Sequence, residues 1–176
     1  MSDTPLPAGV TTGEPVLLAL YHCWGTWRGN RRYPRRQDVD PAGMPGLLEN
    51  VMLIDVERPA AEPGEAARPV FRYRLIGTGV TFSAGYDLTG SSFDALPDPA
   101  FRAFCQTLFE HALVLGEPVS ADGSRTLAGQ RWSFDSILLP LSEDGRTIGT
   151  FLAALVYPKE RNLGMRPHPH WNWHRS

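Results

Sequence analysis

The chain has 176 residues, which is enough for one domain with a substantial core. Hydrophobic residues make up 42% and charged residues 20%, a balance that excludes an intrinsically disordered chain. The formal net charge of −2 argues against nucleic acid or an anionic membrane as a partner.

The chain begins with a predicted tail and a predicted helix. Residues 1–13 are rich in Pro, Thr and Gly and are expected to form a flexible tail. A helix is predicted over residues 14–27, because Pro15 suits its first turn and its apolar residues recur at helical spacing. The apolar face must be buried on the domain itself or on a partner copy, which makes four residues interface candidates: Leu17, Leu20, Trp24 and Trp27.

The next segments lead into a predicted hairpin. Residues 40–49 favour a short helix, made irregular by Pro45 and Gly46. Residues 51–57 alternate apolar and polar side chains and predict a strand. A second strand is predicted over residues 71–78, after a Pro-rich and Ala-rich loop, and the two strands form an antiparallel pair.

The second half of the chain predicts a long helix followed by three strands. Short helical turns are expected over residues 79–97, which are rich in glycine, and the long helix is predicted over residues 98–115. The strands are predicted over residues 119–127, 130–141 and 147–157, and the last two are joined by a turn at Asp144–Gly145.

This order of elements predicts an α+β fold in one domain over residues 14–157, with a second tail over residues 158–176. Because the connections between strands are short, we expect a five-stranded antiparallel sheet. The long helix should cover one face of the sheet, and short helices and the N-terminal amphipathic helix should complete the fold.

Several sequence blocks within about residues 15–157 carry a family resemblance: residues 27–36 (WRGNRRYPRR), 38–41 (DVDP), 53–57 (LIDVE), 71–78 (FRYRLIGT), 85–90 (GYDLTG) and 138–142 (LLPLS) before Asp144–Gly145. On these blocks the chain resembles a proteobacterial family of stand-alone PAS-like domains. The resemblance implies a PAS fold with a helix-lined cavity and a sensory or regulatory role, without a known ligand.

The leading hypothesis is a sensory domain that binds a small ligand or a protein partner and relays a signal through dimer or partner contacts. The N-terminal helix is expected to be the element that responds to binding. The cavity should lie between the 98–115 helix and the sheet, with six candidate lining residues: Tyr73, Phe104, Leu108, His111, Trp132 and Phe134.

Two alternatives stay open. One is a ligand-free adaptor for protein–protein interaction, docking through the Trp24 and Trp27 face. The other is a haem-binding gas or redox sensor, because haem-binding PAS domains carry an axial histidine on the helix that corresponds to residues 98–115, where His111 lies. The block Asn-Cys-Arg-Phe of flavin photosensors is absent, so Cys105 is interpreted as a core residue.

Five arginines lie between residues 28 and 36 and suggest either phosphate binding or a structural role. The structural role is favoured by the negative net charge. In that role the arginines would join the N-terminal helix to strand carboxylates such as Asp55 and Glu57.

No enzyme and no metal site are predicted. The sequence shows no nucleophile and base at a recognisable spacing. His168, His170 and His174 lie in the C-terminal tail, where a loose chain is the favoured interpretation. Two cysteines fit a reducing compartment, and no apolar run is long enough for a signal peptide or membrane span, so we expect a cytoplasmic location.

Overall fold

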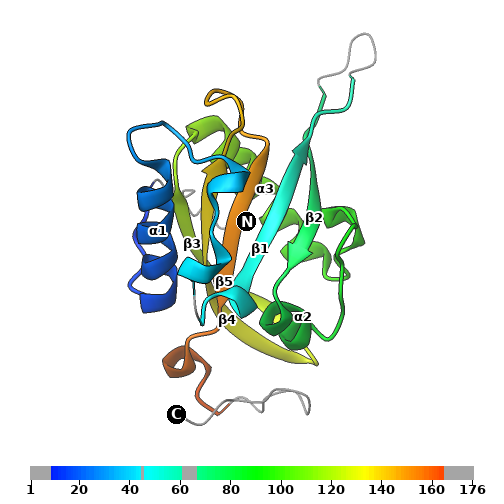
Figure 1. The fold of residues 1–176 in the computed structure, drawn as a ribbon. Helices are drawn as coiled ribbons and strands as arrows, with labels where there is room; N and C mark the ends of the chain where they lie inside the picture. The colour runs from blue at the N-terminus through cyan, green and yellow to red at the C-terminus, as the bar shows by residue number, and fades with distance from the viewer. Residues whose placement is uncertain (1–8, 45, 61–66, 165–176) are drawn as a thin grey trace.

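The computed structural model describes residues 9–44, 46–60 and 67–164. Five antiparallel strands form one sheet in the order β2-β1-β5-β4-β3, which confirms the predicted α+β fold (Figure 1). The strands are β1 (Val51–Glu57), β2 (Val70–Ile76), β3 (Val119–Leu127), β4 (Gln130–Leu141) and β5 (Thr150–Val156). The α-helices are α1 (Pro15–Arg28), α2 (Thr78–Ala84) and α3 (Pro99–Leu115).

The central strand β5 is buried on both of its faces. Its residues from Phe151 to Leu155 are all buried, although successive side chains of a strand point to opposite faces. Both faces of the sheet therefore need a cover of apolar side chains. Figure 1 shows α1 on one side of the sheet and α3 on the other, so that two helices supply these covers.

The long helix α3 has the ends that its sequence predicts. The Asp98 carboxylate accepts hydrogen bonds from the backbone N–H groups of Ala100 and Phe101, and Pro99 occupies the first turn. Gly116 ends the helix with a φ of 64°, a left-handed conformation that glycine adopts readily. The apolar stripe of α3 lies against the sheet.

The helix α1 is packed within the same chain. Leu17, Leu20 and Trp24 are 0%, 0% and 4% exposed, and the indole Nε1 of Trp24 donates to the carbonyl of Pro140 at 2.9 Å. Trp27 is only partly buried, at the edge of this face. Of the two ways to bury the face that the sequence left open, the structure shows burial on the domain itself.

The arginine-rich segment makes ion pairs that differ from those expected. Asp55 and Glu57 on β1 pair with Arg74 and Arg72 of the neighbouring strand β2, each at 2.6 Å. These partners are closer because antiparallel pairing sets β2 directly beside β1. Within the arginine-rich segment itself, Arg31 pairs with Asp38 at 2.7 Å.

Two loops show why element boundaries moved from their predicted positions. The last strand begins at Thr150 rather than residue 147, because the Asp144 carboxylate accepts from the N–H groups of Arg146 and Thr147 and holds them in a turn. The predicted helix over residues 40–49 is instead two short 3₁₀ turns, Pro41–Gly43 and Leu48–Asn50, the second of which is labelled η3. Within the described ranges, no helix has the length and apolar character needed to cross a membrane.

Gly77 is required by a close approach between two backbones. A Cβ at this position would lie 2.4 Å from the carbonyl oxygen of Leu48 and 2.5 Å from that of Glu49. Because of this contact the start of α2 packs against η3, which sets the position of α2 relative to the sheet.

We expect Gly77→Ala to destabilise the fold by about 1–3 kcal/mol, because the backbone of η3 must move to admit the methyl group. Gly25→Ala is the matched control, since no atom lies within 4 Å of a Cβ there and the residue is inside α1. Gly25→Ala should stabilise the protein by up to about 1 kcal/mol. Urea unfolding measures both, and equal effects of the two changes would contradict this account.

We expect Trp24→Phe to lower the free energy of unfolding by about 1–3 kcal/mol, because it leaves the buried Pro140 carbonyl without its donor. The same change at Trp27, which is partly exposed, should have a smaller effect. Urea unfolding of both variants measures the difference, and equal losses at Trp24 and Trp27 would contradict this account of the hydrogen bond.

Candidate functional site

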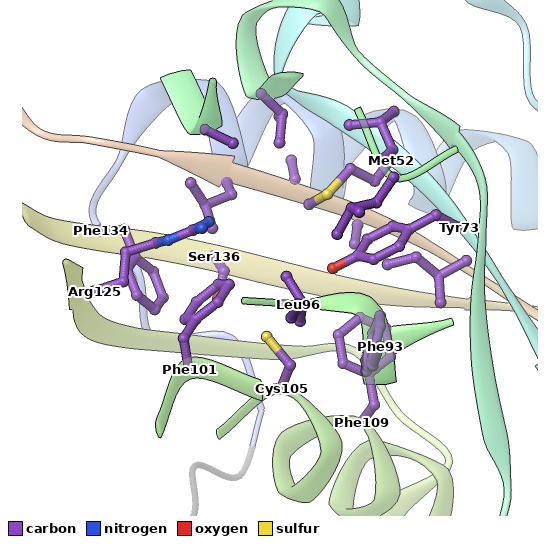
Figure 2. Close-up of a pocket in the computed structure, with 18 of the residues that line it drawn as sticks. Met52, Tyr73, Phe93, Leu96, Phe101, Cys105, Phe109, Arg125, Phe134 and Ser136 are labelled. Carbon is purple, nitrogen blue, oxygen red and sulfur yellow. The ribbon is translucent and has the colours of Figure 1, made fainter. Parts of the chain in front are cut away.

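A cavity of about 60 Å³ lies between α3, α2 and the sheet (Figure 2). Its wall is almost entirely apolar and is formed by residues of α2, α3 and all five strands. The lining residues include Met52 and Ile54 of β1, Tyr73 of β2, Val80 and Ala84 of α2, Phe101, Phe104, Cys105, Leu108 and Phe109 of α3, Arg125 of β3, Phe134, Ser136 and Leu138 of β4, and Ala153 and Leu155 of β5, together with Tyr86 and Leu96.

Four of the six residues that were predicted to line a cavity lie in this wall: Tyr73, Phe104, Leu108 and Phe134. They come from α3 and from the strand faces that α3 covers, as the apolar patterns indicated. Their role in binding a ligand stays a prediction.

His111 and Trp132, the other two residues expected in the wall, do not line this cavity. His111 is about a quarter turn of helix away from the centre of the stripe that includes Phe101, Cys105 and Leu108. Trp132 lies nearer the start of β4 than the lining residue Phe134. Its ring packs edge-on against Tyr157, with ring centroids 6.1 Å apart. The helical and strand periodicities place both residues near the stripe but do not decide where the cavity ends.

A haem does not fit this site. The cavity has room for roughly four to six water-sized groups, many times less than a porphyrin needs. Among the described residues there is no group of three or more His, Cys, Asp or Glu side chains that could hold a metal ion. The tail histidines His168, His170 and His174 are outside the described residues.

The cavity contains a buried arginine that sequence reasoning missed. Arg125 is only 6% exposed, and its guanidinium lies over the ring of Phe101 at 4.0 Å from the centroid. Its Nη2 donates to the hydroxyl of Tyr86 at 2.5 Å, whereas its buried Nε has no hydrogen-bond partner in the structure. The available signal was the alternation of β3, which places Arg125 on the same face as Gly123 and Leu127.

Arg125 keeps its positive charge in this setting. Burial lowers the pKa of the guanidinium, but the phenol groups of Tyr157 and Tyr86 raise it, and the resulting pKa lies above its ordinary value. Among the described residues Arg125 makes no ion pair. The nearby Asp98 carboxylate is engaged by the N–H groups at the start of α3, and these bonds contribute most to lowering its pKa.

The other titratable groups at the cavity are held neutral. Burial raises the pKa of the Cys105 thiol to about 12 and raises the pKa of the Tyr73 phenol well above its ordinary value. Figure 2 shows the Tyr73 hydroxyl and the Cys105 sulfur directed into the cavity. Among the described residues that line the cavity, only Arg125 has a charged side chain.

Gly123 on β3 makes room for an aromatic part of the wall. A Cβ at this position would lie 2.7 Å from Cζ of Phe134, its partner across the β3–β4 pair. The ring of Phe134 therefore lies over the backbone of β3, where it packs edge-on against Phe101 and Phe104 at 5.6 Å. This cluster covers one end of the cavity, next to Arg125 (Figure 2).

A second hollow lies on the surface between α3 and the start of β2. It is larger, about 350 Å³, and it is lined by Arg68 and Arg102 among other residues. Both arginines already have partners, because Arg68 pairs with Glu110 at 2.6 Å and Arg102 donates to the carbonyl of Asp94 at 2.8 Å. The cavity under α3 is the better candidate site, because its wall is almost entirely apolar and holds Arg125, which makes no ion pair among the described residues.

A family model described as PAS domain matches residues 13–156, so this chain belongs to the PAS-domain family. PAS domains are sensory and signalling modules, and in general they are not enzymes. The class of this protein is therefore that of a sensory domain. No curated protein matches the chain.

Solved structures similar to the chain include a PAS domain and two light-oxygen-voltage proteins. The PAS domain of BvgS from Bordetella pertussis is 15% identical, with a TM-score of 0.49 over 65% of this chain and 83% of that one. A variant of RsLOV is 16% identical, with a TM-score of 0.46 over 70% and 65%. An RNA-binding light-oxygen-voltage receptor is 15% identical, with a TM-score of 0.44 over 89% and 41%.

We expect Cys105 to resist alkylation by iodoacetamide at pH 8 in the folded protein, because its thiol is buried and its pKa of about 12 keeps it protonated. Cys23 is partly exposed and should react first. Intact-mass measurement of the Cys23→Ser variant, folded and in denaturant, isolates Cys105. Rapid labelling of the folded variant would show that the cavity opens readily to solvent.

Proposed function

We propose that this chain is a sensory PAS domain whose input is a small, largely apolar molecule bound in the cavity between α3 and the sheet. The observation that carries this proposal is the cavity of about 60 Å³ between α3, α2 and the sheet, with apolar walls and a few polar groups directed into it. Such a composition is typical of small-molecule sites. A well-packed core leaves few voids of this size, so a cavity in the centre of the domain favours a binding role over a filled scaffold.

We propose α2 as the element that responds to binding. It lines the cavity through Val80, Thr81 and Ala84, yet it has no buried residue, so it is the least firmly packed wall. The N-terminal helix was expected to respond, but α1 covers the opposite face of the sheet and contributes no residue to the wall. A ligand shifts an equilibrium by its differential affinity for the two states, and α2 can contribute to that difference directly because it lines the cavity.

The signal is proposed to pass on through contacts with a second copy or a separate signalling protein, in the cytoplasm. Two exposed leucines support an output surface beside α2. Leu48 belongs to η3, which packs against α2, and Leu75 lies near the end of β2, just before α2 begins. Both side chains are 46% exposed. The ligand-free adaptor would use the same kind of contact with no input from the cavity.

We expect 1-propanol, used as a neutral probe, to shift the amide NMR signals of α2 and of the cavity face of α3, but not those of α1. The variant Ala153→Leu should abolish these shifts, because Ala153 lies in the wall between Met52 and Leu138 and a larger side chain fills the space. Ile137→Val is the matched control, since Ile137 is buried in the same strand region but is not part of the wall.

The two outcomes separate the candidate functions. Saturable shifts that survive Ile137→Val and disappear in Ala153→Leu support the ligand sensor. Xenon serves as a second neutral probe. If 1-propanol and xenon both leave the NMR signals of the cavity residues unchanged, the proposed ligand function fails and the adaptor becomes the better account.

A further inference from the structure

We propose that the ligand of this cavity is a short-chain monocarboxylate, with its carboxylate paired to Arg125 and its hydrocarbon part among the apolar side chains of α3 and the sheet. This inference rests on the proposed function and narrows it to a chemical class.

The first argument is the unpaired charge of Arg125. A buried charge is normally paired or fully hydrogen-bonded, because its removal from water is costly. Arg125 is 6% exposed, but its Nε donates to no acceptor and its guanidinium has no carboxylate partner among the described residues. An anion in the cavity supplies what this side chain lacks.

The second argument comes from how the other arginines of this protein are satisfied. Arg72 binds Glu57 through both edge nitrogens, with Nε to Oε1 at 2.6 Å and Nη2 to Oε2 at 3.1 Å. A carboxylate matches this planar edge of a guanidinium, which is why such pairs recur. The Nε on the same edge of Arg125 has no partner in the structure, while the guanidinium hydrogen-bonds the phenol groups of Tyr86 and Tyr157.

The third argument is the size and lining of the site. A volume of about 60 Å³ admits roughly four to six water-sized groups, which suits a carboxylate with a chain of one to three carbons. The single negative charge of a monocarboxylate balances the single positive charge of the wall, which is on Arg125. The rest of the wall is apolar and favours a hydrocarbon tail over a second charged group.

Two phenol groups connect this anion site to its surroundings. The Tyr73 hydroxyl faces the cavity, where it is a second donor for a carboxylate. Tyr86 follows Gly85, the residue that ends α2, and it accepts from the guanidinium. A carboxylate that draws Arg125 toward itself therefore acts on the end of α2 through this hydrogen bond.

The test compares propionate with propionamide, which has the same shape and no charge, and with 1-propanol. Dissociation constants are measured by NMR titration of the folded wild-type chain at constant ionic strength set by chloride. We expect wild type to bind propionate about 10- to 100-fold more tightly than propionamide, as a charge-assisted hydrogen-bonded pair should. The Arg125 side-chain Nε–H signal should shift with propionate.

Variants then assign the effect to Arg125. Arg125→Gln should weaken propionate by the same factor and change propionamide by less than about threefold, and Arg125→Lys should recover part of the loss because it keeps the charge without the planar edge. Tyr86→Phe keeps the charge and should retain the preference for propionate. The wild-type comparison stands by itself if Arg125→Gln does not fold.

Four outcomes would count against the carboxylate. Equal binding of propionate and propionamide, or binding of propionate that Arg125→Gln leaves unchanged, overturns it. Binding of 1-propanol or xenon without propionate also overturns it, while the cavity keeps its proposed function. If none of these probes binds, the carboxylate proposal and the proposed function both fail.

Discussion

The structure depends on one constraint, which is that β5 is apolar on both faces and lies at the centre of the sheet. A strand of this kind is stable only when both faces of the sheet are covered. The helices α1 and α3 provide the two covers, and they do so differently. On the α1 side Trp24 is fixed by a hydrogen bond to Pro140, whereas on the α3 side the packing leaves a cavity.

The cavity joins a weakly packed wall to a buried charge. α2 has no buried residue, and its position is set largely by the contact of Gly77 with η3. Arg125 reaches the same cavity from β3 and is joined by Tyr86 to the segment that follows α2. A bound molecule would therefore meet the charge and the weakly packed wall together, as the proposed sensory function requires.

Buried polar groups distinguish this cavity from an ordinary packing defect. The cavity holds Arg125 in its charged form, while burial keeps the Cys105 thiol and the Tyr73 phenol protonated. The neutral donors Cys105 and Tyr73 and the positive charge of Arg125 favour an anionic ligand over a cationic one. The high pKa of Cys105 also argues against a redox role for this thiol, because the thiolate is the reactive form.

The sequence by itself determined the elements, because periodicity and capping are local. The strands at residues 51–57, 119–127 and 130–141 and the ends of α3 follow directly from alternation, from Asp98 and from Gly116. The apolar patterns also placed Tyr73 and Phe134 on the sheet face that α3 covers, and Phe104 and Leu108 on the side of α3 that faces the sheet.

Only the tertiary structure decided which groups meet. Local patterns could not tell whether the face of Leu17, Leu20 and Trp24 is buried within the chain or against another copy, since both satisfy the same periodicity. They could not place the edge of the cavity between Leu108 and His111, because that edge depends on how side chains from several strands fill the space. Arg125 was missed for the same reason: in a chain with 17 Lys and Arg residues, burial and the lack of an ion pair are properties of the folded neighbourhood alone.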